Sequence, residues 1–156
     1  MSANQETSER STHPAYQAPS KGRILVLDNE DSILRLLRVI LEGEGYEVRT
    51  TDDGHQALKM AEAEGFDLVI QDLRMPKMDG MTFLRILKER QPRAICIVLT
   101  AFGTWETAVE AMRLGAYTHL SKPFDTEELR NLVGRAMERR HRLDERPGRR
   151  PRRSDR

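Results

Sequence analysis

Four polar residues that could carry chemistry stand at the ends of short apolar runs in this 156-residue sequence. They are Asp28, Asp72, Thr100 and Lys122. The runs before them are too short for helices and rich in β-branched residues, so they predict buried strands of a parallel sheet. Because open α/β sheets bind their ligands at the carboxyl ends of the strands, we expect these four side chains to converge there.

The residue types at these strand ends suit phosphoryl transfer. Carboxylates from Asp28 and Asp72 would repel each other unless a cation were present, and an all-oxygen site with few protein ligands suits Mg²⁺. The hydroxyl of Thr100 and the ammonium of Lys122 suit the oxygens of an incoming phosphoryl group. We therefore interpret Asp72 as a nucleophile that becomes an aspartyl phosphate.

Each of these residues also has a plainer interpretation when it is taken alone. The carboxylate of Asp72 can cap the loop after its strand, Thr100 can be an ordinary β-branched strand residue, and Lys122 can be a solvated surface lysine. Their combination, with the Pro and Gly of the loop after Asp72, favours a site over these readings.

The elements that would position these residues alternate between strand and helix. Strand patterns cover residues 24–27, 46–51, 66–70, 94–99 and 117–120, and a helical pattern follows each of them. This alternation predicts an α/β domain, a three-layer sandwich in which a parallel sheet lies between two layers of helices. The second strand is the most polar of the five, so we expect it at an edge of the sheet.

The charge distribution divides the chain into three parts. Residues 1–21 are polar and lack apolar periodicity, which predicts a disordered arm before one folded domain over residues 22–140. From Arg135 onward there are 10 arginines against 4 acidic residues, whereas residues 1–134 hold 16 Lys and Arg against 21 Asp and Glu. Residues 141–156 are therefore expected to form a basic, disordered tail. Without a recognition module, such a tail would bind nucleic acid only non-specifically, so a nucleic-acid partner is not expected.

Compartment and membrane association are also constrained. No apolar segment approaches the roughly 20 residues that span a bilayer, and no signal-peptide pattern opens the chain. The single cysteine, Cys96, lies inside an apolar run and is interpreted as a core residue, which fits a reducing compartment. We expect a cytoplasmic protein without a membrane partner.

Four motifs identify a family when they are taken together. Asp28-Asn29-Glu30, QDLRMPKMDG (71–80), LTAFGT (99–104) and SKPF (121–124) resemble, in order and separation, the receiver domain of two-component response regulators. The run TAFGTWETAVEAMRLGAY (100–117) further looks like receivers of the nitrogen-regulation type. Those usually precede an ATPase and a DNA-binding domain, for which this sequence leaves no room, so a stand-alone receiver is expected.

The resemblance implies a specific fold and site. The fold would be flavodoxin-like, with a five-stranded parallel sheet of order 2-1-3-4-5 and five helices. Asp72 would be the phosphoacceptor, and Mg²⁺ would be held by Asp28, Asn29, Asp72 and the backbone carbonyl of Arg74. The peptide bond between Lys122 and Pro123 would be cis.

The resemblance also implies partners. A sensor histidine kinase would supply the phosphoryl group, and a separate output protein would recognise the face built by the fourth helix, the last strand and the fifth helix. Activation could form a homodimer through this face. The domain would take part in its own phosphorylation and dephosphorylation and is not expected to be an enzyme.

Two residues depart from the family pattern. Asn29 stands where a second acid is usual, which removes one negative charge from the metal site but leaves a carbonyl ligand. His119 stands where the family has an aromatic switch residue, usually Tyr or Phe, that acts with Thr100. Both departures favour the main alternative, a pseudo-receiver that binds partners independently of phosphorylation.

Two classes of enzyme are weaker alternatives. An aspartyl-phosphate hydrolase would carry a second Asp two residues after the nucleophile, where this chain has Arg74. A P-loop nucleotide hydrolase would need GxxxxGK[ST] after a strand, and the sequence lacks it.

Overall fold

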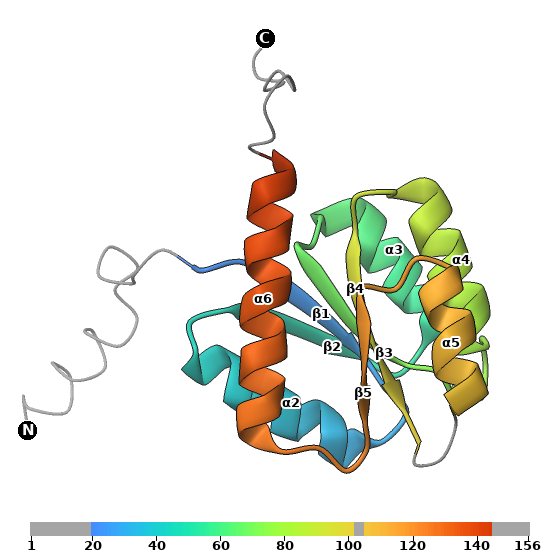
Figure 1. Cartoon of the computed structure of the whole chain (residues 1–156), viewed down its shortest axis with the longest axis horizontal. Helices are drawn as coiled ribbons and strands as arrows, with labels where there is room; N and C mark the ends of the chain where they lie inside the picture. Colours follow the sequence, from blue (N-terminus) through green and yellow to red (C-terminus); the bar gives the residue numbers. More distant parts are fainter. Residues whose placement is uncertain (1–19, 102–104, 145–156) are drawn as a thin grey trace, which may run out of the picture.

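The computed structural model describes residues 20–101 and 105–144 of the chain. Strands and helices alternate along the described residues, as the sequence patterns predicted (Figure 1). The elements are β1 (Arg23–Leu27), α2 (Asp31–Gly43), β2 (Glu47–Thr51), α3 (Gly54–Glu64), β3 (Leu68–Asp72), α4 (Gly80–Arg90), β4 (Ile95–Thr100), α5 (Trp105–Arg113), β5 (Thr118–Ser121) and α6 (Thr126–Asp144).

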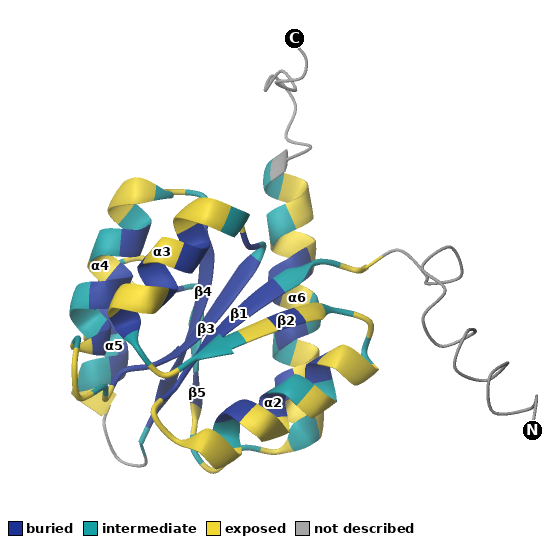
Figure 2. Ribbon diagram, turned by 180° about the vertical axis from the view of Figure 1, so that it is seen from behind, coloured by how far each residue is buried: buried dark blue, intermediate teal, exposed yellow. Residues whose placement is uncertain are grey.

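The five strands form one parallel sheet in the order β2-β1-β3-β4-β5. Helices α2 and α6 cover one face, and α3, α4 and α5 cover the other (Figures 1 and 2). This is the predicted three-layer, flavodoxin-like α/β fold. The peptide bond between Lys122 and Pro123 is cis, as the family resemblance implied.

Burial on both faces explains why the central strands are continuous apolar runs. In β1, Ile24 and Val26 pack with α2 and α6, whereas Leu25 and Leu27 pack in the opposite cluster with α3 and α4. All residues of β3 and β4 are buried in the same way (Figure 2). The edge strand β2 needs only one apolar face and exposes Glu47 and Arg49, so its predicted edge position is confirmed.

The register of the sheet aligns the carboxyl ends of the strands. Gln71 in β3 pairs with Leu27 at the end of β1, and Thr100 at the end of β4 pairs with Ser121 at the end of β5. Residues that follow these strand ends therefore lie at the same edge of the sheet, although they are far apart in the sequence.

Helix α6 is longer than the sequence predicted. It runs to Asp144, whereas fraying was expected beyond Arg140. Two tertiary contacts explain the extension, because Arg140 donates to the carbonyl of Arg93 at 2.9 Å and Leu143 packs against the core cluster of α2 and α6. Residues 1–19 and 145–156, which hold most of the predicted arm and tail, lie outside the described residues.

In the ranges 20–101 and 105–144, no helix combines the length and the apolar character needed to cross a bilayer.

Candidate functional site

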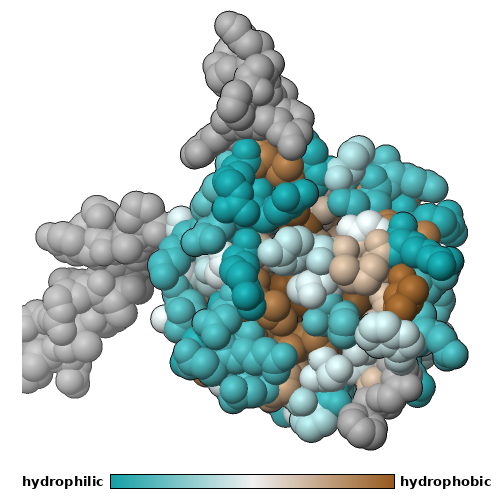
Figure 3. All heavy atoms as spheres, in the orientation of Figure 1, coloured by the Kyte–Doolittle hydropathy of each residue, from teal (hydrophilic) through white to brown (hydrophobic). Residues whose placement is uncertain are grey.

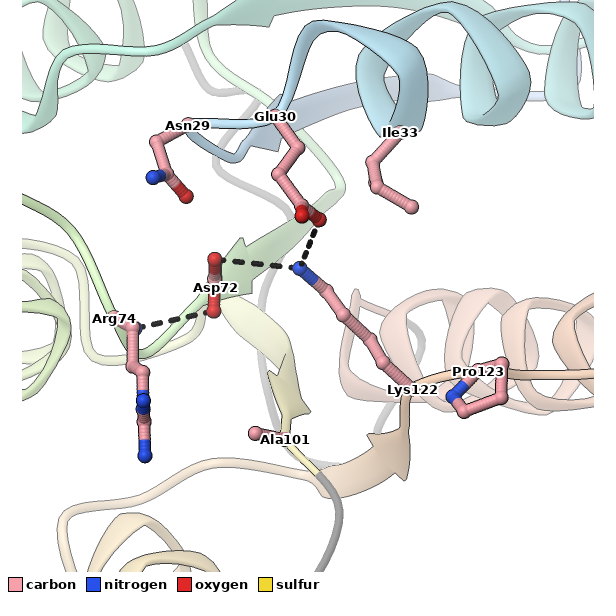
Figure 4. A pocket seen from close by; sticks show the side chains of 8 residues that line it. All are labelled: Asn29, Glu30, Ile33, Asp72, Arg74, Ala101, Lys122 and Pro123. Atoms are coloured by element: carbon pink, nitrogen blue, oxygen red, sulfur yellow. Dashed lines mark hydrogen bonds and ion pairs between the residues drawn. The ribbon is translucent and has the colours of Figure 1, made fainter.

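A cavity of about 480 Å³ opens at the carboxyl edge of the sheet (Figure 4). Its lining comes from the last residue of β3, from the segments that follow β1, β3, β4 and β5, and from the first turn of α2. The lining residues are Asn29, Glu30, Ile33, Asp72, Arg74, Ala101, Lys122 and Pro123. The structure thus brings together four of the predicted site residues, Asn29, Asp72, Arg74 and Lys122.

Lys122 lies among three carboxylates. Its Nζ is 2.9 Å from Oδ2 of Asp28, 3.2 Å from Oε1 of Glu30 and 3.3 Å from Oδ2 of Asp72. Figure 4 shows the Lys122 and Glu30 side chains meeting above Asp72, with the Arg74 guanidinium turned away from them. One ammonium faces three carboxylates, so the site carries net negative charge and suits a further cation.

Asp28 is the most strongly desolvated of these acids. It is 0% exposed, and burial raises the pKa of its carboxyl above the ordinary value, while the Lys122 ammonium and the Glu30 amide partly oppose this and Asp72 adds to it. Oδ2 of Asp28 lies close to the ammonium, yet no donor among the described residues is aligned to hydrogen-bond to it.

The pKa shifts of Asp28 and Lys122 have opposite consequences for the stability of the fold at neutral pH. A raised carboxyl pKa means that the folded state holds the proton more tightly, so ionised Asp28 opposes folding at neutral pH, and this cost disappears as pH falls through the raised pKa. Burial alone would lower the pKa of Lys122, but the carboxylates of Asp28, Asp72 and Glu30 raise it overall. Its stabilising contribution is complete below the ordinary lysine pKa and is lost only as pH rises through the raised one.

Local backbone contacts fix the two aspartates. Oδ1 of Asp28 accepts a hydrogen bond from the amide of Glu30 at 2.8 Å, and Oδ1 of Asp72 accepts one from the amide of Arg74 at 3.1 Å. Each aspartate therefore orders the loop that follows its own strand. Asp72 is 6% exposed, so its carboxylate is nearly enclosed but reaches the cavity.

Three predicted residues lie outside the lining of this cavity: Asp28, which reaches it only through its ion pair with Lys122, Thr100 and His119. Thr100 is buried at the end of β4, where its carbonyl accepts from the amide of Lys122 at 2.8 Å, and its neighbour Ala101 lines the cavity instead. His119 is half-buried in β5. The adjacent Leu120 packs with α2 and α6, so His119 points toward the opposite face of the sheet, which carries α5.

The structure adds residues that sequence reasoning gave no role. Glu30 belongs to the first motif, but only its ion pair with Lys122, 92 residues away, places it at the site. Gln71 is fully buried and donates from Nε2 to the carbonyl of Gly80 at 2.9 Å, which closes the loop carrying Arg74. A polar residue inside an apolar strand was the available signal for Gln71.

The fold and the site together define a class of protein. A 2-1-3-4-5 parallel sheet with an acidic cavity and one lysine at its carboxyl edge is the arrangement of a receiver domain. Residues 24–134 match the response regulator receiver domain family. The chain belongs to this family.

The relatives are regulators of the type that the sequence suggested. The chain is 39% identical over 116 residues to the regulatory protein AtoC of Escherichia coli, which covers 74% of this chain and 25% of AtoC. It is 37% identical to the DNA-binding transcriptional regulator NtrC of Proteus hauseri, covering 75% of this chain and 25% of NtrC. The chain thus spans about a quarter of the length of the curated relatives it matches.

A solved structure supports the same assignment. The NtrC4 receiver domain, determined as a beryllofluoride-activated dimer, is 38% identical and superimposes with a TM-score of 0.72. The match covers 76% of this chain and 98% of the NtrC4 receiver. The predicted likeness to nitrogen-regulation receivers is therefore confirmed.

Proposed function

We propose that this receiver is a phosphorylation-activated switch that accepts a phosphoryl group on Asp72. The observation that carries the proposal is the placement of the Asp72 carboxylate at an open cavity, 3.3 Å from Lys122 and beside the acids of the β1 end. A carboxylate oxygen forms the new bond to phosphorus as the bond to the donor's leaving group breaks. The leaving group, a histidine nitrogen in a kinase, keeps the electron pair.

The residues present fit Mg²⁺. Two carboxylates would not complete the coordination of the ion, so it would need neutral ligands as well. Asp28 and Asp72 would supply carboxylates, and Asn29 and the Arg74 carbonyl would supply neutral oxygens, a hard donor set that leaves room for water. The bound ion would offset the negative charge of the incoming phosphoryl group.

The chain's own residues act on the transferred group. The Lys122 ammonium, already oriented by carboxylates, would contact one phosphoryl oxygen, and the Thr100 hydroxyl at the neighbouring strand end would donate to another. The domain thereby promotes its own phosphorylation and dephosphorylation. The donor would be a sensor histidine kinase in the cytoplasm.

The test of this function is reaction with acetyl phosphate and Mg²⁺, followed by intact-mass analysis of the full chain. We expect a base-labile adduct of one phosphoryl group that disappears when EDTA replaces Mg²⁺. Absence of an adduct, with the fold intact by circular dichroism, would instead favour the phosphorylation-independent interaction module.

Asn29→Asp is expected to tighten Mg²⁺ binding about tenfold. A charge some 4 Å from the ion contributes several kcal/mol at an effective dielectric of about 20, and desolvation removes most of that gain. Isothermal titration calorimetry measures the change, with Asn131→Asp on the exposed side of α6 as a charge-matched control. Equal Mg²⁺ affinity in Asn29→Asp and in the wild type would show that Asn29 is not part of the metal site.

We further propose that the signal leaves through the face formed by α5, β5 and α6. Figure 3 shows apolar side chains gathered between α6 and α5. Trp105 and Met112, one heptad apart on α5, are 72% and 42% exposed. Such exposure of large apolar side chains is typical of an interaction surface, and an output protein or a second copy of the chain would cover it.

Phosphoryl binding would drive this face toward its active form. Hydrogen bonds from Thr100 and Lys122 that differ by roughly 2 to 4 kcal/mol between the two states would change the equilibrium about 30-fold to 1,000-fold. We expect the phosphoryl mimic beryllofluoride to increase association in sedimentation velocity and to alter hydrogen exchange within residues 105–143. His119→Phe should strengthen the response, because a phenyl ring that becomes buried at this position has no polar imidazole to desolvate. Binding of beryllofluoride without a change in association or in hydrogen exchange would contradict the proposed output face.

A further inference from the structure

A second cavity, of about 450 Å³, lies at the opposite edge of the sheet from Asp72. It is formed by the loops that lead into β4 and β5 and by side chains of α4 and α6. Its lining residues are Lys88, Pro92, Arg93, Ala94, Ile95, Gly115, Ala116, Tyr117, Arg139 and Leu143. Because β4 and β5 are parallel, their amino ends place this cavity a full strand length away from the phosphorylation site.

The position of Lys88 in the wall of this cavity is fixed. Its Nζ donates to the carbonyls of Pro92 at 2.8 Å and Ala94 at 2.7 Å, and a Cβ at Gly115 would lie 3.0 Å from its Cε. Gly115 has a φ of +109°, so a side chain is disfavoured there on both counts. The lysine stem therefore passes over Gly115, and its ammonium is held by neutral carbonyls.

Two of the three cationic side chains that line this cavity have no acidic partner within the described part of the chain. Neither Lys88 nor Arg139 forms a salt bridge there, whereas Arg130 and Arg140, also on α6, pair with Glu44 and Asp67. Burial lowers the pKa of Lys88, and the positive charge of Arg139 lowers it further. The repulsion between the two cations would be relieved by an anion between them.

The nearby thiol cannot serve as that anion. Cys96 is fully buried, and burial raises the pKa of its thiol to about 12, so it is neutral at physiological pH. The wall also holds a third cationic side chain, Arg93, together with apolar side chains. Tyr117 and Leu143 are both half-buried and pack against the core beside the two cations.

We propose that this cavity binds a small organic anion, a carboxylate or phosphate carried on an apolar group. The anionic group would lie between Lys88 and Arg139, and the apolar group against Tyr117 and Leu143. The site is separate from the phosphoacceptor cavity and does not depend on its function. Ligand binding would join the ends of α4 and α6 to the loops that begin β4 and β5.

The test is a titration of the ¹⁵N-labelled full chain with phenyl phosphate and with benzoate, followed by NMR. Both anions should shift the amide resonances of residues 93–96 and 115–117. The anion that binds more tightly shows whether the site prefers a phosphate or a carboxylate. Benzyl alcohol, which has the same ring without the charge, should bind at least about tenfold more weakly, because hydrogen bonds to a charged group are stronger than those to a neutral one.

Substitutions separate charge recognition from general surface effects. Arg139→Gln should weaken binding about threefold to tenfold, because the arginine is exposed and its contact is partly screened. Arg135→Gln, one turn earlier on α6 and outside the lining, should leave the affinity unchanged. Lys88→Gln should weaken binding further if it folds, and Arg139→Gln carries the test if it does not. Equal binding of benzyl alcohol, shifts confined to the Asp72 site, or an unaffected Arg139→Gln would each overturn the proposal.

Discussion

Asp72→Asn is expected to abolish the base-labile phosphoryl adduct that acetyl phosphate and Mg²⁺ form on the wild-type chain. The amide retains the shape of the side chain and can still accept from the amide of Arg74, but it lacks the charged oxygen nucleophile. Neither Asp28 nor Glu30 should replace it. Asp28 is 0% exposed and does not line the cavity, and the Glu30 carboxylate is paired with the Lys122 ammonium.

Intact-mass analysis with and without hydroxylamine or base measures the adduct. Asp79→Asn is the matched control, because Asp79 is an exposed acid in the same loop and makes no side-chain cap to α4, so it should phosphorylate like the wild type. Thermal unfolding of both variants shows that the fold is retained. An undiminished adduct in Asp72→Asn would move the phosphoacceptor to another residue and refute the assignment.

Gly80→Ala is expected to destabilise the fold by about 3 kcal/mol or more, since it forces a methyl group into a fully packed contact. A Cβ at Gly80 would lie 2.5 Å from Cα of Leu73, 2.6 Å from the carbonyl oxygen of Asp72 and 2.7 Å from that of Leu73. All three are backbone atoms, so no flexible side chain can move aside. The displaced segment would also strain the bond from Gln71 to the Gly80 carbonyl.

Urea unfolding of the two proteins measures this loss. Gly134→Ala is the control, because Gly134 lies within α6 and, apart from the backbone of its own helix, no atom lies within 4 Å of the added Cβ, so Ala should be neutral or stabilise by up to about 1 kcal/mol. We also expect Gly80→Ala to phosphorylate more slowly, since Gly80 closes the loop that presents Arg74. A loss below about 1 kcal/mol would show that β3 and α4 separate easily at this point.

The sequence was sufficient to predict the strands and helices and the edge of the sheet at which the site lies. Strands covered on both faces must be apolar throughout, so β1, β3 and β4 were visible as continuous runs. Parallel strands share a carboxyl edge, so residues placed after each run had to meet there. The strand order and the cis bond before Pro123 came from the family resemblance, because periodicity does not specify which strands are neighbours.

Only the tertiary structure decided which side chains meet. Glu30 joins Lys122 across 92 residues, and Ala101 lines the cavity where Thr100 was expected, since both depend on how the loops turn after the strand ends. The length of α6 depended on Arg140 and Leu143 finding partners on other elements, which local helix signals do not encode.

The charges show the same division between sequence and structure. Counting residues gave an acidic body and a basic end, but the pairing of each charge depends on distances that folding creates. Three carboxylates share Lys122 at one edge of the sheet, whereas Lys88 and Arg139 line the opposite edge with no salt bridge in the described part of the chain. The sequence by itself determined the fold class and the chemical groups available at the site. The packing of helices on the sheet decided which of these groups neutralise one another, because electrostatic interactions depend on separation and burial rather than on order along the chain.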